Sequence, residues 1–458
     1  MGFDIRALLE QHRSDGARLH AEHVNAQVPK MLHAIGFDRV FVRAEGAHYW
    51  DDAGNRYLDF LSGFGVAGVG RGHPVVRQAL HDVLDADYAD LLQFDLPVLP
   101  GLVAEKLVSL APGMERVYFC NSGSEAVEAA LKFARCATGR PRIVFCSHAY
   151  HGLTAGTLSV NGAEEFRKGF DPLLPDTMVP FGDLEALERE LKKGDVAAYL
   201  VEPIQGKGVH VPAPGFLRAA QDLLRQYGAL LICDEVQTGL GRTGTWFAYE
   251  HEDVQPDIVT VAKALSGGFV PVGATMARAG IFEKVYSSLD RVFVHASTFM
   301  GNALAMTAAL ATLSVIEDEA LLDNTATRGQ ELVAGIRAIA EEHPMIVDVR
   351  GRGLMIGIEF GKPSTVRGKA VWKTLDTARK GLFAQLVVVP LFTRHGVLTQ
   401  VAGDHMAVVK LLPPLTIGTA EVQEFLTAFA DVMKDAERPN GLAWEFGKTL
   451  AKQALART

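Results

Sequence analysis

From about residue 75 onward, short apolar runs alternate with amphipathic segments, and this alternation limits the chain to few folds. The apolar runs are typical of buried strands, and the segments between them have apolar residues at helical spacing. The runs are RVYFC, RIVFCS, AAYLVEP, ALLICDE and DIVTVAK. Strands that alternate with helices form βα units, which build a mostly parallel sheet covered on both faces. We therefore expect an α/β fold.

The segments on either side of this region have different patterns. Residues 1 to about 40 are polar with a helical pattern, and the next stretch predicts a hairpin around residues 52–55. A long helical region at 302–343 leads to further strand-like runs and a closing helix. Because 458 residues exceed the usual size of a single core, we expect several parts. They are an N-terminal segment with a hairpin at 1–60, a large domain at 61–325 and a smaller α+β C-terminal domain at 326–458.

Composition excludes several classes of protein. The net charge of −9 argues against general nucleic-acid binding, which needs a basic face. The four cysteines lack CxxC spacing, which favours buried thiols over a metal site or disulfides. The N-terminus has no apolar signal region, and GLFAQLVVVPLF is about half the length of a membrane-spanning helix. We expect a cytoplasmic protein without a membrane span.

Two of the apolar strands end on charged side chains. LLICDE ends on Asp234 and Glu235, and DIVTVAK ends on Lys263. In open α/β sheets, ligands bind beyond the carboxyl ends of the strands. A lysine at an apolar strand end loses solvation, so its pKa falls and its amine becomes a usable nucleophile. A lysine for a carbonyl and a carboxylate for a cationic ring nitrogen are the pair that pyridoxal phosphate (PLP) requires.

A phosphate site is predicted between strand RVYFC and the helix that follows it. Ser122, Gly123 and Ser124 precede a helix opening at Glu125, where unpaired N–H groups favour an anion. The alternative is an ordinary serine-capped helix, because Ser-x-x-Glu is a common cap. In HAYHGLT, Tyr150 and His151 could stack on a flat cofactor or lie in a surface loop.

Taken together, these segments resemble the class III aminotransferases of the ornithine, acetylornithine and putrescine type, a PLP family of fold type I. The resemblance covers nearly the whole chain. It rests on six motifs in the family's order: NSGSEAVEAALKFAR, VEPIQGKG, ICDEVQTGLGRTG, PDIVTVAKALSGG, STFMGNALA and LLPPLTI. It implies a large domain with a mostly parallel seven-stranded sheet, PLP as cofactor, and a homodimer with shared active sites.

The resemblance also implies roles for individual residues. Lys263 would hold the cofactor covalently and move the substrate proton, and Asp234 would pair with the ring nitrogen. The other implied cofactor contacts are Ser122, Gly123 and Ser124 at the phosphate, Tyr150 with His151 and Val236 at the ring, Gln237 at the ring hydroxyl and Thr298 in the partner subunit's phosphate site. Glu202 and Lys410 are the candidate substrate contacts, and Glu235 with Arg242 is expected to serve structure.

The sequence departs from the family at three positions. Leu153 and Lys410 stand where arginine is common, and Lys207 stands where glutamate is common. A lysine lacks the planar fork that grips a carboxylate. We therefore expect the donor to be a primary amine without a distal carboxylate: a diamine, an ω-amino compound or an apolar-tailed amine. The acceptor would be a keto acid such as 2-oxoglutarate or pyruvate. The apolar stretch at 381–406 could line a groove for an apolar tail or form core.

Several alternatives stay open at this point. Acetylornithine or ornithine could be the donor despite the three departures. An aminomutase, epimerase or decarboxylase of the same fold would have the same lysine, aspartate and phosphate site. A dehydrogenase is suggested only by GFGVAG at 63–68, whose glycines do not open a helix. A non-catalytic binding protein would not need Lys263 or Asp234.

Overall fold

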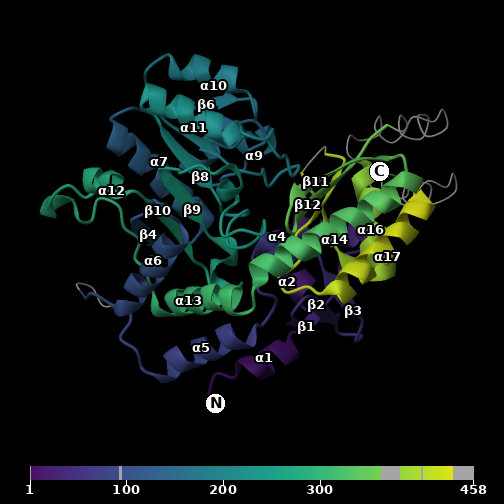
Figure 1. The fold of residues 1–458 in the computed structure, drawn as a ribbon. Coiled ribbons are helices and arrows are strands. Elements are labelled where there is room, and N and C mark those ends of the chain that lie inside the picture. The colour runs from purple at the N-terminus through teal and green to yellow at the C-terminus, as the bar shows by residue number, and fades with distance from the viewer. Residues whose placement is uncertain (1, 92–94, 363–381, 404–405, 437–458) are drawn as a thin grey trace.

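The computed structural model describes residues 2–91, 95–362, 382–403 and 406–436. Its largest layer is a seven-stranded sheet in the order β4-β10-β9-β8-β7-β5-β6 (Figure 1). The strands are β4 (Arg116–Cys120), β5 (Arg142–Cys146), β6 (Thr177–Val179), β7 (Val196–Val201), β8 (Leu230–Asp234), β9 (Ile258–Val261) and β10 (Gly273–Ala277). Strand β10 is antiparallel to both neighbours, and the other pairs are parallel. The expected α/β fold with a mostly parallel sheet is confirmed.

Helices cover both faces of this sheet, as the apolar strands require. Along β5, Ile143 and Phe145 belong to one buried cluster, while Val144 and Cys146 belong to another. The first cluster lies under α7 (Gly123–Thr138) and α12 (Ala279–Val285). The second lies under α6 (Val98–Leu110), α10 (Leu184–Leu191), α11 (Phe216–Tyr227) and α13 (Ala303–Asp318). Alternate side chains of a strand point to opposite faces, so each strand contributes to two cores.

Further helices and turns connect these layers. They are α4 (Ser62–Gly65), α5 (Pro74–Asp85), α8 (Ala155–Ser159), α9 (Glu164–Arg167) and the 3₁₀ turns η1 (Ala248–Glu252), η2 (Lys263–Ser266) and η3 (Leu289–Arg291). The glycine run at 63–68 lies around α4, and α5 begins only at Pro74. These glycines therefore do not form the strand-to-helix turn that a dinucleotide site requires.

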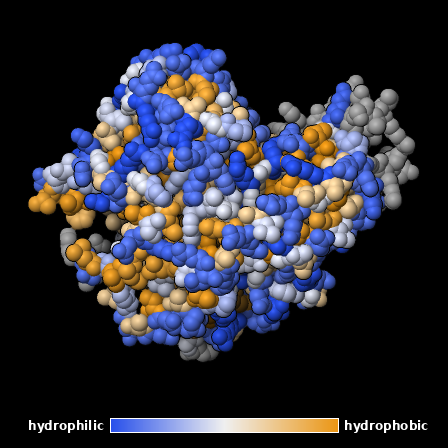
Figure 2. Space-filling view, viewed as in Figure 1, coloured by the Kyte–Doolittle hydropathy of each residue, from blue (hydrophilic) through white to orange (hydrophobic). Residues whose placement is uncertain are grey.

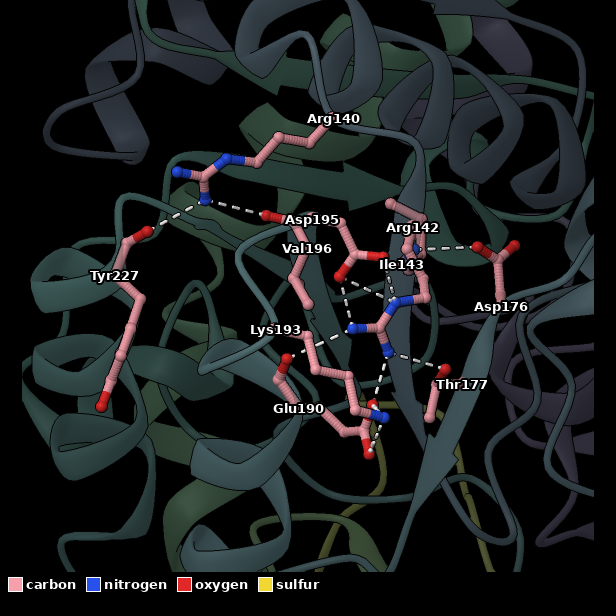
Figure 3. A network of polar contacts seen from close by, with 10 residues as sticks. All are labelled: Arg140, Arg142, Ile143, Asp176, Thr177, Glu190, Lys193, Asp195, Val196 and Tyr227. Atoms are coloured by element: carbon pink, nitrogen blue, oxygen red, sulfur yellow. Dashed lines mark hydrogen bonds and ion pairs between the residues drawn. The ribbon is translucent and has the colours of Figure 1, made fainter.

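A network of charged groups fixes the edge of the sheet that lies far from strand β4 (Figure 3). The guanidinium of Arg142 donates hydrogen bonds to the carboxylates of Glu190 and Asp195 and to the hydroxyl of Thr177. Asp176 accepts from the backbone N–H of Ile143 at 2.8 Å. These bonds tie strand β6, which is three residues long, to β5 and α10.

The long helical region at 302–343 is two helices, α13 and α14 (Leu321–Glu342), because residue Ala320 has a left-handed backbone with φ 49°. Helix α14 runs from the large sheet toward the C-terminal layer (Figure 1). That layer contains an antiparallel sheet, α16 (Leu382–His395) and α17 (Thr419–Ala436). Its strands, in sheet order, are β11 (Ile346–Arg352), β12 (Met355–Phe360), β15 (Val408–Leu411) and β14 (Gln400–Val401).

The N-terminal segment packs against this C-terminal layer. Strands β1 (Phe41–Glu45), β2 (His48–Asp51) and β3 (Arg56–Asp59) form the expected hairpin region, and β3 pairs in parallel with β13 (Val397–Leu398). Three helices precede it: α1 (Ile5–Gln11), α2 (Gly16–His23) and α3 (Gln27–Ile35). None of the three has a buried residue.

The large apolar side chains described in the stretch at 381–406 are mostly core, although Thr393 and Arg394 are exposed; residues 381 and 404–405 lie outside the described part. Helix α16 buries Phe383, Leu386, Val387, Leu391 and Phe392, each at most 2% exposed. These five side chains therefore do not line a groove for a substrate tail. Across the described segments, no helix is both long and apolar enough to cross a membrane.

Candidate active site

A cavity of about 520 Å³ lies at the carboxyl ends of β8 and β9, beside the N-terminus of α7. It is lined by Val66, Asn121, Ser122, Gly123, Ser124, Tyr150, His151, Gly152, Asp234, Val236, Ala262, Lys263, Ser266 and residues 268–272. Eight of the ten predicted cofactor residues are among them. Sequence reasoning missed Asn121, Gly152 and Ser266, although all three stand within motifs that it singled out.

Lys263 lies directly beyond the carboxyl end of strand β9. Its backbone has a positive φ of 34°, a conformation unusual for a residue with a side chain. Within the described ranges, no group accepts a hydrogen bond from its Nζ atom. Burial lowers the pKa of the Lys263 ammonium, while the negative charges of Asp234 and Glu202 act in the opposite direction. The site thus contains an amine that loses its proton more readily than a lysine in water.

Asp234, the last residue of β8, is 4% exposed and has a partner for each oxygen. Its Oδ2 atom lies 2.6 Å from Nδ1 of His151, and its Oδ1 accepts hydrogen bonds from the N–H of Val236 and the hydroxyl of Thr260. The other nitrogen of His151, Nε2, is buried and has no partner among the described residues. Asp234 is therefore a fixed carboxylate at the cavity wall.

The start of helix α7 is a serine-capped helix end and also presents unpaired N–H groups, so it has the features of both interpretations that the sequence left open. Ser122 caps the helix, because its Oγ accepts from the N–H of Glu125 at 3.2 Å. The Glu125 carboxylate in turn accepts from the N–H of Asn121 at 2.6 Å. In the described structure no acceptor faces the N–H groups of Gly123 and Ser124. The capped helix therefore still presents two unpaired donors at its positive end, which suits an anion.

Gly123 and Gly152 leave no room for a Cβ atom beside this anion site. A Cβ on Gly123 would lie 2.9 Å from Cγ1 of Val236, and a Cβ on Gly152 would lie 2.2 Å from Oγ of Ser124. Gly152 also has a φ of +118°, which a side chain would strain. The loop after β5 and the residues after β8 therefore pack closely on the start of α7.

Glu202 supports the loop that carries Tyr150 but does not line the cavity. Its Oε2 accepts from the N–H of Tyr150 at 3.0 Å, and its Oε1 accepts from the N–H of Gly206 at 2.8 Å. Burial raises the pKa of the Glu202 carboxyl; His151 opposes this effect and Asp234 reinforces it. The ring of Tyr150 packs edge-on against Phe166 of α9, with centroids 5.5 Å apart.

Lys410 and Gln237 contact each other beside the cavity rather than in its wall. The Lys410 Nζ donates to the carbonyl of Gly206 at 2.7 Å and to Oε1 of Gln237 at 3.1 Å. The Gln237 amide nitrogen donates to the carbonyl of Phe64 at 3.0 Å. Burial lowers the pKa of Lys410 to about 7, and the charges of Lys263 and Lys207 act in the same direction.

Three other positions singled out from the sequence lie outside the cavity. Thr298 is exposed, on the segment that follows η3. Glu235 and Arg242 are both buried, and each makes its own set of contacts. Glu235 accepts from the hydroxyl of Thr238 and the N–H of Tyr249. Arg242 donates to the carbonyls of Leu354 and Pro413, which ties the large sheet's loop to the C-terminal layer.

The fold and this cavity define a PLP protein of fold type I, and comparisons with known proteins agree. The model of the family "Aminotransferase class-III" matches residues 33–433. The ornithine aminotransferase of Toxoplasma gondii, whose structure contains partially occupied PLP, superposes with a TM-score of 0.82 at 31% identity, covering 95% of this chain and 98% of that one. A transaminase from a marine Virgibacillus gives a TM-score of 0.80 at 25% identity, covering 87% and 93%. The chain belongs to the class-III aminotransferases, a PLP-dependent family.

Two curated relatives cover this chain to a similar extent. Aminotransferase PigE of Serratia sp. is 37% identical over 93% of the chain, and the acetylornithine aminotransferase of Methanopyrus kandleri is 39% identical over 87%. The alignment covers 95% of the Methanopyrus protein but 54% of PigE. The chain thus spans about half the length of the Serratia relative.

The residues of the cavity fit PLP. The unpaired N–H groups of Gly123 and Ser124 suit its phosphate, and the carboxylate of Asp234 suits a protonated ring nitrogen. Lys263 offers an amine without a competing acceptor in the described structure. The volume of about 520 Å³ lies within the range of small-molecule sites.

Proposed function

We propose that this protein transfers an amino group from a primary amine without a distal carboxylate to a keto acid such as 2-oxoglutarate or pyruvate. Membership of the class-III aminotransferases supports the reaction type. The observation that carries the choice of donor is that no arginine is among the described residues lining the cavity. A planar guanidinium is the group that proteins use most readily for bidentate binding of a carboxylate.

When bound, PLP supplies a carbonyl for the amino group and a ring that accepts electrons from the reacting carbon. In our proposal Lys263 holds the cofactor and then takes the proton from the carbon that bears the substrate nitrogen. A positioned base of this kind contributes about 10²–10⁴-fold to a rate. Asp234 keeps the ring nitrogen protonated, and His151 fixes the direction of that carboxylate.

The remaining roles follow from position. Ser122, Gly123 and Ser124 bind the phosphate, and Tyr150 and Val236 enclose the ring between the loop after β5 and the segment after β8. Gln237 is less available to contact the ring hydroxyl. Its amide oxygen accepts a hydrogen bond from Lys410, and its amide nitrogen donates one to the carbonyl of Phe64. Glu202 acts by fixing the backbone at Tyr150 and Gly206 rather than by touching the cavity.

The three departures from the family support a donor without a second carboxylate. The Leu153 side chain is 51% exposed and carries no charge. Lys207 is paired with Glu165, and two of the three possible N–H donors of Lys410 are used by Gly206 and Gln237. The one remaining donor of Lys410 suits the single α-carboxylate of a keto acid. The tail of an apolar amine would gain little from α16, because the large apolar side chains of that helix, such as Phe383 and Phe392, are buried in the core.

The experiment is a set of half-reactions with the holoenzyme. Putrescine and ornithine form a matched pair, because ornithine is putrescine with one added carboxylate; n-alkylamines and acetylornithine extend the series. The spectral change of the cofactor gives kcat/KM for each donor without an acceptor. We expect putrescine to exceed ornithine. If ornithine or acetylornithine is the best donor by about tenfold, a lysine binds the distal carboxylate in place of the family's arginine, and the proposal fails.

We also propose a homodimer in which Thr298 completes the phosphate site of the partner subunit. The segment around Thr298 exposes Leu289, Phe293 and Phe299 at 88%, 71% and 59%. It follows α12, which lies at the left of the molecule, where Figure 2 shows apolar surface. Large exposed apolar side chains in one segment mark an interaction surface. Light scattering should give twice the chain mass, and Thr298→Ala should weaken PLP binding without dissociating the dimer.

A further inference from the structure

Lys207 is a second cation beside the active site, and its place follows from its neighbours. It directly follows Gly206, whose carbonyl accepts the Lys410 ammonium. Its positive charge contributes to the lowered pKa of Lys410, so the two ammonium groups are within electrostatic range. Its stem passes Gly403, where a Cβ would lie 3.4 Å from Cε of Lys207. The Lys207 side chain is 13% exposed.

The ammonium of Lys207 is held by helix α9. It forms an ion pair with the carboxylate of Glu165 and lies 4.5 Å from the centroid of the Phe166 ring. Phe166 in turn packs against Tyr150, which lines the cavity. Lys207 therefore lies beside the cavity, one aromatic ring away from the lining residue Tyr150, and its charge is paired with Glu165.

We propose that Glu165 is a specificity-determining residue: by pairing with Lys207 it withholds that ammonium from the substrate site, so that the enzyme prefers keto acids with no carboxylate beyond the α-carboxylate. The inference rests on the proposed aminotransferase function and deepens it on the acceptor side. A keto acid with a distal carboxylate must place a second anion on this side of the cavity. Lys410 has one remaining donor, which the α-carboxylate takes, and Lys207 is neutralised by Glu165, so the distal anion finds no further cation at this place among the described residues.

The test compares acceptors of equal chain length in the second half-reaction. Holoenzyme that has received an amino group is mixed with 2-oxoglutarate or with 2-oxopentanoate, which differ in the distal carboxylate. The ratio of the two kcat/KM values is measured for the parent, for Glu165→Gln, for Glu164→Gln and for the double variant Glu165→Gln/Lys207→Met. Glu164 is the matched control, because it is an exposed acid on the same helix without an ion pair to Lys207 in the described structure.

We expect the parent to favour 2-oxopentanoate. In Glu165→Gln the ratio should move toward 2-oxoglutarate by about fivefold, the upper end of what a partly exposed ion pair supplies. Glu164→Gln should leave the ratio within twofold of the parent, and the double variant should lose the gain. Because the amide keeps the shape of Glu165, a loss of packing at α9 would change both acceptors alike.

A binding measurement keeps the inference testable where turnover is slow. Calorimetry with the holoenzyme compares glutarate with pentanoate, and Glu165→Gln should tighten glutarate alone. A parent that prefers 2-oxoglutarate by tenfold, an unchanged ratio in Glu165→Gln, or a gain that persists without Lys207 would each overturn the inference. The donor series tests the proposed function separately, so either can fail while the other stands.

Discussion

The Nδ1 atom of His151 lies 2.6 Å from Oδ2 of Asp234, and both side chains are almost completely buried at the cavity wall. The two residues follow different strands of the sheet. His151 lies in the loop after β5, and Asp234 is the last residue of β8. The contact fixes one carboxylate oxygen, while Val236 and Thr260 fix the other. An anion held by three neighbours costs little reorganisation when a cationic ring is placed against it.

The first prediction concerns this carboxylate. Asp234→Asn keeps the shape and removes the charge, so the ring nitrogen loses its support. An opposite charge at contact shifts a pKa by about 1–3 units, so proton abstraction should slow by about 10–10³-fold while PLP binding weakens much less. Single-turnover kinetics and PLP titration separate the two effects. Asp257→Asn is the control, because Asp257 lies at the opposite end of β8 and β9. A variant within a few-fold of the parent would refute the role.

A second prediction concerns the covalent attachment. Borohydride treatment of the holoenzyme followed by peptide mapping should label Lys263 and no other lysine, because its Nζ has no acceptor among the described residues. Lys263→Ala should still bind PLP through Gly123 and Ser124 but lose turnover by at least about 10²–10⁴-fold. Lys410 is the informative comparison, since burial lowers its pKa as well. A label on Lys410 would contradict the assignment.

The main sheet could be predicted because short apolar runs and amphipathic helices alternate over a long stretch. The apolar character of a strand does not reveal its direction, so the antiparallel β10 was not foreseen. The pairing of β3 with β13 was also not predictable, since it joins residues such as Leu58 and Val397 that are far apart in the chain. The expected domain boundaries at 60 and 325 stay a prediction.

Within the site, the sequence placed the residues that end strands and begin helices. Lys263, Asp234 and Ser122 were found in this way, because their position in an element determines where they lie. The partners of Lys207 and Lys410 could not be predicted from the sequence. Those contacts join loops from separate regions, and a lysine that pairs with Glu165 has the same sequence signature as a solvated one.

The third prediction is a pH dependence from Lys410. Its pKa is about 7 in the folded protein and near the ordinary 10.5 in the unfolded chain. Between these values the unfolded chain binds more protons, so the free energy of unfolding should rise with pH, by at most about 1.4 kcal/mol per pH unit. This contribution is fully present above the unfolded pKa and is lost as pH falls to about 7. Urea unfolding of the holoenzyme at pH 6.5–9 should show it.

The comparison with Lys410→Met isolates this effect from other titrating groups. Methionine keeps most of the stem volume and cannot titrate, so the pH slope should be smaller in the variant by the amount assigned to Lys410. Lys192→Met serves as the control, because the Lys192 side chain is 57% exposed. Equal slopes for the parent and Lys410→Met would mean that Lys410 stays charged when folded.

The last prediction separates backbone strain from the shape of the anion site. Gly152 and Gly139 both have positive φ, at +118° and +68°, and both adjoin helix α7, Gly152 at its start and Gly139 at its end. Alanine at either position strains the backbone by about 1–3 kcal/mol, so both variants should lose stability on thermal unfolding.

Only at Gly152 does the new Cβ meet an obstacle, since Oγ of Ser124 would lie 2.2 Å away, whereas nothing lies within 4 Å at Gly139. Gly152→Ala must therefore displace the start of α7 with its two unpaired N–H groups, and PLP affinity should fall by about tenfold or more, as one charged hydrogen bond would account for. Equilibrium titration of both apo variants with PLP measures this, and equal affinities for the two would show that the anion site tolerates the displacement.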